Sequence, residues 1–213
     1  MNPSSYTSQS RTAIADPVLH AALVNLQERL GKGAARGYMD FPEGPDLRLK
    51  AHDIRMETIA NLDVILETLA NNIRNSGGHV HFALDAQSAV DHCLDIARKH
   101  EVTMAVKGKS MLSEEIGLNN AFAAAGIKAV ETDLGEYIIQ LAGETPSHII
   151  APAIHKTRQQ VGRLFQEKLG IPYSEDPPTL TLAARKALRE NFLKADMGIS
   201  GCNLACAETG HIT

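Results

Sequence analysis

The sequence contains no tryptophan, and aromatic residues make up only 4% of its 213 residues. Stacking platforms for nucleobases or sugars are therefore not expected. Its three cysteines, Cys93, Cys202 and Cys206, form an odd and low number that fits a reducing compartment and provides no disulfide framework. We expect a cytoplasmic protein.

Positive charge and long apolar runs are lacking as well. The formal net charge is −4 at pH 7, and the absence of a basic stripe argues against nucleic-acid binding through counterion release. No uninterrupted apolar run approaches the length of a membrane span. We therefore expect no nucleic-acid partner and no membrane span. The 44% apolar and 22% charged residues are instead typical of a soluble globular protein with a sizeable core.

The spacing of potential metal ligands is unfavourable. Cys202 and Cys206 fall in a strand predicted over 198–207, where a rise of roughly 3.3 Å per residue would separate them by about 13 Å, too far for one ion. The Cys-x-x-Cys-x-x-Cys runs of iron–sulfur proteins are absent. His79 and His81 have no further ligand at suitable spacing. We expect no metal and no cofactor within this chain.

The first part of the chain predicts helices after a polar, flexible tail over 1–16. Asp16 followed by Pro17 is typical of a helix start, and apolar residues three or four apart continue from it. Residues 17–78 would form a helical arm that either covers the core or binds a partner. The predicted elements are a helix over 17–30, a connection over 31–45 and a helix over 53–75.

From residue 79 onward, short apolar segments alternate with helical patterns. This alternation indicates βαβ units, and hence an α/β domain over 79–213 with a mostly parallel sheet flanked by helices. A last strand starting at His211 would be cut off at Thr213, so we expect the domain to be truncated at its C-terminal end. The predicted strands are 79–84, 103–106, 127–130, 148–151 and 198–207, and the predicted helices are 86–100, 114–125, a segment from 134, 155–169 and 180–194.

One candidate ligand site follows the strand predicted over 103–106. Lys107, Lys109 and Ser110 lie in a loop before a helix for which Ser113 is the predicted N-cap. Two cations beside the N–H groups of a helix start suit a small anionic ligand such as a phosphate, a carboxylate or a CoA pyrophosphate. The loop matches neither a P-loop nor a dinucleotide fingerprint. The alternative is that both lysines are simply solvated.

Candidate acid–base residues follow the next strand. Glu131, Asp133 and Glu136 are close in sequence, and neighbouring carboxylates can act as acid or base. Asp133 and Glu136 match a capping box, which leaves Glu131 without a structural task. His155, before a predicted helix, could contact an anion or shuttle a proton, although solvation alone would explain it.

The final predicted turn is the third candidate. Glu208, Thr209 and Gly210 could bring a carboxylate and a hydroxyl to the cleft that holds Glu131 and His155. Turn formation alone would also explain these residue types.

Several long motifs resemble one known family, the lactate-utilization (LUD) domain family, and within it the lactate utilization protein B group. The resemblance covers the chain from about residue 17 to its end. It is carried by Lys107-x-Lys-Ser-Met-x-Ser-Glu-Glu-Ile-Gly-Leu-Asn119, Glu131-Thr-Asp-Leu-Gly-Glu-Tyr-Ile-Ile-Gln-Leu141, His148-Ile-Ile-Ala-Pro-Ala-Ile-His-Lys-Thr157 and Ala195-Asp-Met-Gly-Ile-Ser-Gly201.

This resemblance implies a fold like that of sugar-phosphate isomerases and CoA-transferases. It also implies a part in a multi-subunit complex that oxidises L-lactate to pyruvate, with sister subunits as partners. The group's [4Fe–4S] clusters are expected only in a ferredoxin-like region after this domain, so this chain alone would not transfer electrons. Gly108 departs from the small polar residue expected between the lysines. Two alternatives remain: a stand-alone enzyme acting on a sugar phosphate or acyl-CoA, and a non-catalytic fragment that binds subunits.

Overall fold

The computed structural model describes residues 3–148 and 151–213, and the chain divides into two compact units. The first unit comprises Met1–Gly77 together with Cys206–Gly210, and the second comprises Gly78–Ala205 with His211–Thr213. The first unit is mainly helical, and its Cys206–Gly210 segment comprises the end of a strand and a turn. The second contains a small parallel sheet flanked by helices, as the mostly parallel α/β class predicted.

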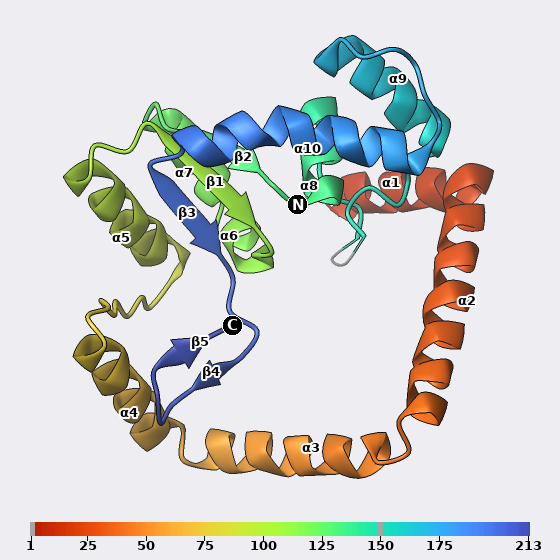
Figure 1. The fold of residues 1–213 in the computed structure, drawn as a ribbon. Coiled ribbons are helices and arrows are strands. Elements are labelled where there is room, and N and C mark those ends of the chain that lie inside the picture. Colours follow the sequence, from red (N-terminus) through yellow and green to blue (C-terminus); the bar gives the residue numbers. More distant parts are fainter. Residues whose placement is uncertain (1–2, 149–150) are drawn as a thin grey trace. The chain divides into compact units, whose positions relative to one another are not determined.

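The first unit is a succession of helices that together cover more of the chain than the sequence predicts (Figure 1). The side chain of Asp16 accepts hydrogen bonds from the N–H groups of Val18 and Leu19, which confirms the predicted helix start. The predicted connection over 31–45 is wrong, because the helix continues to Asp40. The helix predicted over 53–75 is divided at Asn61, and a helix lies where the tail was predicted. These helices are α1 (Pro3–Ala15), α2 (Pro17–Asp40), α3 (Gly44–Ala60) and α4 (Leu62–Asn75).

The long helices of this unit bury little of their surface. Neither α2 nor α3 contains a buried residue, and α4 buries Ala70. The chain returns to this unit near its end, where the Asn72 side chain donates hydrogen bonds to the carbonyls of Ala207 and Glu208, at 2.8 and 3.1 Å. No helix within the described ranges has both the length and the apolar character to cross a membrane.

The sheet of the second unit is parallel, with the strand order β2–β1–β3 (Figure 1). The central strand is β1 (Met104–Gly108), between β2 (Lys128–Glu131) and β3 (Met197–Ser200). β1 and β2 confirm the strands predicted over 103–106 and 127–130. Their register places Lys107 directly beside Glu131.

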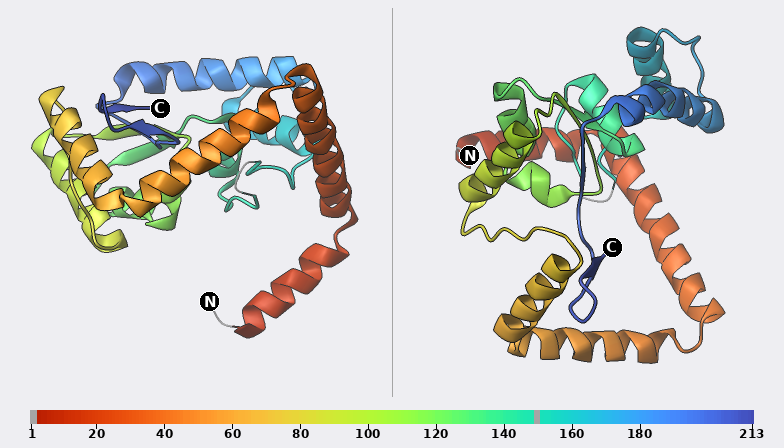
Figure 2. Two further views of the ribbon diagram at one scale, coloured as in Figure 1. Left: turned by 90° about the horizontal axis from the view of Figure 1, so that it is seen from below. Right: turned by 60° about the vertical axis from the view of Figure 1, so that its left-hand side comes forward.

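Helices cover both faces of this sheet. Consecutive strand residues point to opposite faces; accordingly Ala105 belongs to a core cluster with Val90 and Phe122, whereas Val106 packs against another with Phe165 and Leu188. Helices α9 (Arg158–Leu169) and α10 (Pro177–Lys194) lie side by side (Figure 2) and contact each other. The first cluster involves α5 (Ala86–Lys99) and α7 (Leu118–Ala124), and the second involves α8 (Leu134–Ala142), α9 and α10.

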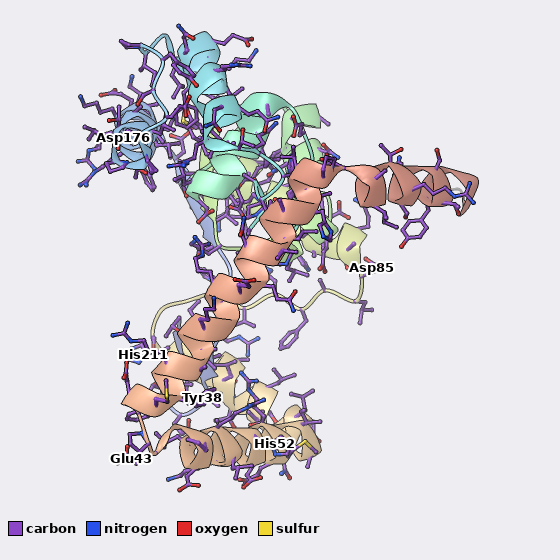
Figure 3. All side chains as sticks on the ribbon, turned by 90° about the vertical axis from the view of Figure 1, so that its right-hand side faces the viewer. Tyr38, Glu43, His52, Asp85, Asp176 and His211 are labelled. Atoms are coloured by element: carbon purple, nitrogen blue, oxygen red, sulfur yellow. The ribbon has the colours of Figure 1, made fainter. Side chains whose placement is uncertain are left out.

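Local caps fix the beginnings of these helices. Asp85 and Asp176, both labelled in Figure 3, accept hydrogen bonds from the backbone N–H groups of Ser88 and Thr179. Asp85 and Ser88 form a capping box, and so do Thr157 and Gln160 at the start of α9. The helices predicted from residues 86, 155 and 180 are therefore present, with starts that differ by up to three residues.

Other predicted elements differ. Residues 79–84 are not a strand: Phe82 and Leu84 are exposed, and no strand within the described ranges pairs with this segment. The strand predicted over 198–207 is divided into β3 and β4 (Ala205–Cys206), and β4 pairs with β5 (His211–Ile212), so Cys202 and Cys206 do not share one strand. The strand predicted over 148–151 includes residues 149–150, which lie outside the described residues.

Candidate functional site

A buried ion pair lies at the carboxyl ends of β1 and β2. Lys107 Nζ is 2.8 Å from Glu131 Oε1, and the two side chains are only 1% and 4% exposed. The parallel register puts these two residues side by side, on the sheet face that also carries Ala105. Because an unpaired charge is costly to bury, each side chain depends on the other for its place in the interior.

The segment after β1 supplies further partners to this pair. Lys107 Nζ donates to Ser113 Oγ at 3.0 Å, and Glu114 Oε1 is 3.9 Å away. Asn119 Nδ2 donates to Glu131 Oε1 at 2.8 Å. The predicted helix over 114–125 is in fact two short helices, α6 (Met111–Glu115) and α7, and they bring these three side chains to the ion pair.

Ser113 is not the N-cap of α6, contrary to the prediction. Ser110 is the cap, and its hydroxyl accepts a hydrogen bond from the N–H of Ser113 at 3.3 Å. Ser113 is instead free to accept from Lys107 while its own hydroxyl donates to the Ser110 carbonyl at 2.6 Å. The earlier start of the helix thus turns Ser113 into part of the buried network.

Both lysines predicted to bind an anion already have carboxylate partners. Lys107 contacts Glu131, and the ammonium of Lys109 pairs with Asp133, which raises the pKa of Lys109. Lys109 also adopts a left-handed backbone conformation with φ of 62°. An anion bound by these lysines would have to compete with Glu131 and Asp133. Anion binding at this loop stays a prediction.

Gly108, between the two lysines, lies close to the next strand end. A Cβ atom at this position would be 2.7 Å from Thr132 Oγ1, which donates to the Lys107 carbonyl at 2.9 Å. A small polar side chain at 108 would therefore require Thr132 to move.

Glu136 is not the capping-box partner that its spacing from Asp133 predicts. Asp133 does cap α8, accepting from the N–H of Gly135 at 3.1 Å. Glu136, however, is only 7% exposed, and its Oε2 has no hydrogen-bond partner among the described residues. Burial raises the pKa of Glu136 to about 7, and the charge of Glu131 adds to this effect while that of Lys107 opposes it. Glu136 can therefore exchange a proton near neutral pH.

Glu131 and Glu136 line a cavity of about 430 Å³ in the second unit. Burial likewise raises the pKa of Glu114, whereas Lys107 acts to lower it. Three buried oxygens of the lining residues lack a hydrogen-bond partner within the described part of the chain: Asn119 Oδ1, Glu131 Oε2 and Glu136 Oε2. The cavity is lined by Glu114, Gly117, Asn119, Asn120, Glu131, Glu136, Ile139, Gln140, Gly143, Glu144, Thr145 and Pro146.

His155, the predicted proton shuttle, is held by side-chain contacts. Its Nε2 is 2.7 Å from Glu144 Oε2, and its Nδ1 is 2.7 Å from Ser147 Oγ. Lys156 Nζ donates to the other oxygen of Glu144 at 2.6 Å. The hydrogen bonds from Lys156 and from His155 lower the pKa of Glu144. Because Glu144 also lines the cavity, it connects His155 to the site.

The predicted turn residues Glu208, Thr209 and Gly210 belong to the first unit, together with α4. Gly210 has φ of 75°, and a Cβ atom there would lie 2.8 Å from the backbone of Asn72, so glycine is required. The structure brings Lys107, Ser110 and Glu131 together within the second unit. A role for the turn in the same cleft stays a prediction.

The predicted site lacks Ser113, Glu114 and Asn119, and Glu136, one of the predicted acid–base candidates, is explained there only as a capping-box residue. A sequence signal existed for one of them. Glu136 directly precedes the apolar run Tyr137–Ile139. When a short helix buries such a run, the adjacent carboxylate can become buried with it.

The cysteines do not fit an iron–sulfur cluster. A [4Fe–4S] cluster takes four thiolates, and the chain has three cysteines, of which Cys93 packs against the core. Cys202 Sγ donates to the Leu204 carbonyl and Cys206 Sγ to Glu208. In the ranges 3–148 and 151–213, no three His, Cys, Asp or Glu side chains are placed to hold a metal ion.

Comparison with known proteins provides the family context for this site. The chain is 41% identical over 207 residues to the uncharacterized electron transport protein YkgF of Escherichia coli K12, covering 97% of this chain and 44% of that protein. It is 41% identical over 199 residues to lactate utilization protein B of Bacillus cereus AH820 and of Bacillus anthracis A0248, covering 93% of this chain and 42% of each relative.

The chain thus spans less than half the length of these relatives. No solved structure matches it. The family model of the LUD domain matches residues 66–213, which include every residue of the cavity. The chain belongs to the LUD domain family.

Proposed function

We propose that this chain is the LUD portion of an iron–sulfur electron-transfer subunit in a system that oxidises L-lactate to pyruvate. The observation that carries the proposal is the 41% identity to lactate utilization protein B over 93% of the chain. The name of the YkgF relative, an electron transport protein, agrees with such a role. We further propose sister subunits of the system as partners and the cytoplasm as the location.

In this proposal the chain does not carry electrons by itself. Its cysteines cannot supply the four thiolates of a [4Fe–4S] cluster. The contribution of the chain is then the polar pocket around Lys107 and Glu131, together with a surface for the other subunits.

A chimera tests the lactate role. In Bacillus cereus, the part of lactate utilization protein B that matches this chain is replaced by the chain itself, and growth on L-lactate as the only carbon source is measured. We expect the chimera to restore growth to a strain that lacks the native protein. We expect the 213-residue chain expressed alone not to restore it.

Two controls make the result decisive. Growth on glucose shows that the strains are viable, and an immunoblot shows that the chimera accumulates. A chimera that accumulates at the native level and still fails to support growth on L-lactate would contradict the proposal, and so would growth restored by the chain alone.

The pocket also favours a second candidate, a stand-alone enzyme acting on a sugar phosphate or acyl-CoA. The supporting observation is Glu136, whose pKa of about 7 suits a general acid or base. Turnover of such substrates by the purified chain, lost on substitution Glu136→Gln, would support this candidate. Absence of turnover across both substrate classes would reject it.

A further inference from the structure

The pocket contains more hydrogen-bond acceptors than donors can satisfy. Glu131 and Glu136 are each more than nine-tenths buried, and each has one oxygen without a partner among the described residues. Asn119 adds a third such oxygen, since its nitrogen already donates to Glu131. A buried acceptor left unpaired costs about 1–3 kcal/mol. All three residues line the same cavity, so a ligand with several donors would satisfy them together.

Negative charge is also in excess there. The lining contains the carboxylates of Glu114, Glu131, Glu136 and Glu144. Among the described residues, the basic side chains that contact them are Lys107, shared between Glu131 and Glu114, and Lys156 and His155, which both contact Glu144. Glu136 has no lysine partner in the described part of the chain. The cavity therefore suits a positively charged ligand better than an anion.

The size and shape of the cavity indicate an organic ligand rather than a metal ion. Its volume of about 430 Å³ is within the range of small-molecule sites. Ile139 and Pro146 line part of it and can contact a carbon skeleton. No group of three metal-ligating side chains is found in the described residues.

We propose that this pocket binds a small organic cation, a molecule with a protonated amine or guanidinium group whose N–H groups donate to Glu131, Glu136 and Asn119. The positive group takes the place of the missing counter-charge, and its carbon skeleton lies against Ile139 and Pro146. This inference does not depend on the lactate role.

Binding of such a cation should release a proton. The charged groups that act on Glu136 are Glu131, Lys107, Asp133 and Glu114. A bound cation adds a positive charge beside them and favours the ionised form of Glu136. Because burial raises the pKa of Glu136 to about 7, part of the Glu136 side chains carry a proton at neutral pH, and a fraction of a proton should leave per ligand bound.

The test is calorimetric titration of the full 213-residue chain at pH 7 with 1,4-diaminobutane and with agmatine. The neutral isostere 1,4-butanediol, sodium L-lactate, inorganic phosphate and magnesium chloride are titrated in parallel. Each titration is run in two buffers of different ionisation enthalpy, which yields the number of protons released. We expect at least one of the two amines to bind at least tenfold more tightly than the diol, with proton release.

Variants assign the effect to the pocket. Glu136→Gln keeps the shape of the side chain but removes its charge and its proton, so affinity should fall at least tenfold and proton release should disappear. Glu167→Gln, which alters an exposed carboxylate paired with Lys168, is the matched control and should bind like the parent. Circular dichroism verifies that each variant is folded.

The opposite results would overturn the proposal. Those results are no binding of either amine, equal binding of the diol, or an amine affinity that Glu136→Gln leaves unchanged. Binding of phosphate, lactate or magnesium in place of the amines would do the same. Growth of the chimera on L-lactate is unaffected by any of these outcomes, so failure of this inference and failure of the lactate proposal are distinguishable.

Discussion

Lys107 and Glu131 show how a single residue pair in register can place charge in the interior of a small domain. Each side chain is almost fully buried, and their charged atoms are 2.8 Å apart. Ser113 Oγ accepts a further hydrogen bond from Lys107, and Asn119 Nδ2 donates one to Glu131. Removing one partner leaves the other as an uncompensated buried charge, which is more costly than losing both.

We therefore expect Lys107→Met to lower the free energy of unfolding by about 3–5 kcal/mol, the cost of breaking a buried pair. Urea unfolding followed by circular dichroism at 222 nm measures the change. The double variant Lys107→Met with Glu131→Leu should recover part of the loss. Lys32→Ala, which removes an exposed pair with Glu28, is the control and should change stability by about 0.5 kcal/mol or less. A Lys107→Met protein as stable as the parent would contradict the ion-pair argument.

Glu136 gives a pH-dependent prediction. Its pKa is raised from 4.5 to about 7 in the folded chain, so the folded state holds a proton that the unfolded state has lost. This contribution to stability is complete below about pH 4.5 and is lost as the pH rises to about 7. The side chain of Glu136→Gln does not titrate. As the pH rises from 5 to 8, the free energy of unfolding of this variant should therefore increase by about 1–3 kcal/mol relative to that of the parent.

Urea unfolding of the parent and of Glu136→Gln at pH 5, 6, 7 and 8 measures this difference. Glu167→Gln serves as the exposed control, for which the difference from the parent should stay constant with pH. A constant difference for Glu136→Gln as well would show that Glu136 does not titrate in this range.

At the scale of elements, helix α9 depends on a close approach to the segment that follows it. Gly162 is buried in α9, and a Cβ atom there would overlap the carbonyl oxygen of Ser174 and press against the ring of Tyr173. The obstructing atom belongs to the backbone, which cannot rotate away as a side chain could. The glycine thus fixes how closely the chain leading to α10 packs on α9.

We expect Gly162→Ala to destabilise the second unit by about 1–3 kcal/mol, the usual cost of overpacking. The control is Gly198→Ala in β3 of the same unit, where an added Cβ meets nothing within 4 Å and the change should not destabilise. Thermal unfolding compares the variants. Equal melting temperatures for Gly162→Ala and the parent would contradict the close packing of α9.

At the scale of the whole molecule, the two units differ in how much surface they bury. Helices α2 and α3 of the first unit contain no buried residue, whereas β1 and β2 of the second carry the buried Ala105, Lys107, Val130 and Glu131. Stability within a protein follows such differences in burial. The first unit should therefore open locally more often than the sheet.

Hydrogen–deuterium exchange of the full chain, followed by mass spectrometry, checks this expectation. Peptides from α2 and α3 should exchange at least about tenfold faster than peptides from β1 and β2, because few buried contacts oppose their opening. Equal protection of α2 and of β1 would contradict the expectation and would indicate that a partner or a second copy of the chain covers these helices.

Sequence reasoning identified part of the candidate site. It named Lys107 and Glu131 because strand ends in parallel sheets are common ligand sites. It assigned Lys107 to an external anion and not to Glu131. The pairing of Lys107 with Glu131 arises only when β1 and β2, which are 24 residues apart in the sequence, lie side by side in the sheet. Asn119 and Glu114 were missed for the same reason. They reach the pair only after the predicted single helix divides into α6 and α7.

Features that depend on neighbours a few residues away can be predicted from the sequence. Asp16, Asp85, Asp133 and Asp176 cap their helices through backbone groups two or three residues away, so residue type and spacing suffice. The other features depend on contacts between distant parts of the chain. Residues 79–84 alternate like a strand but pair with no strand in the part of the chain that the structure describes. Glu136 matches a capping box, yet it is buried beside Glu131, because packing of α8 against the sheet outweighs a local hydrogen bond.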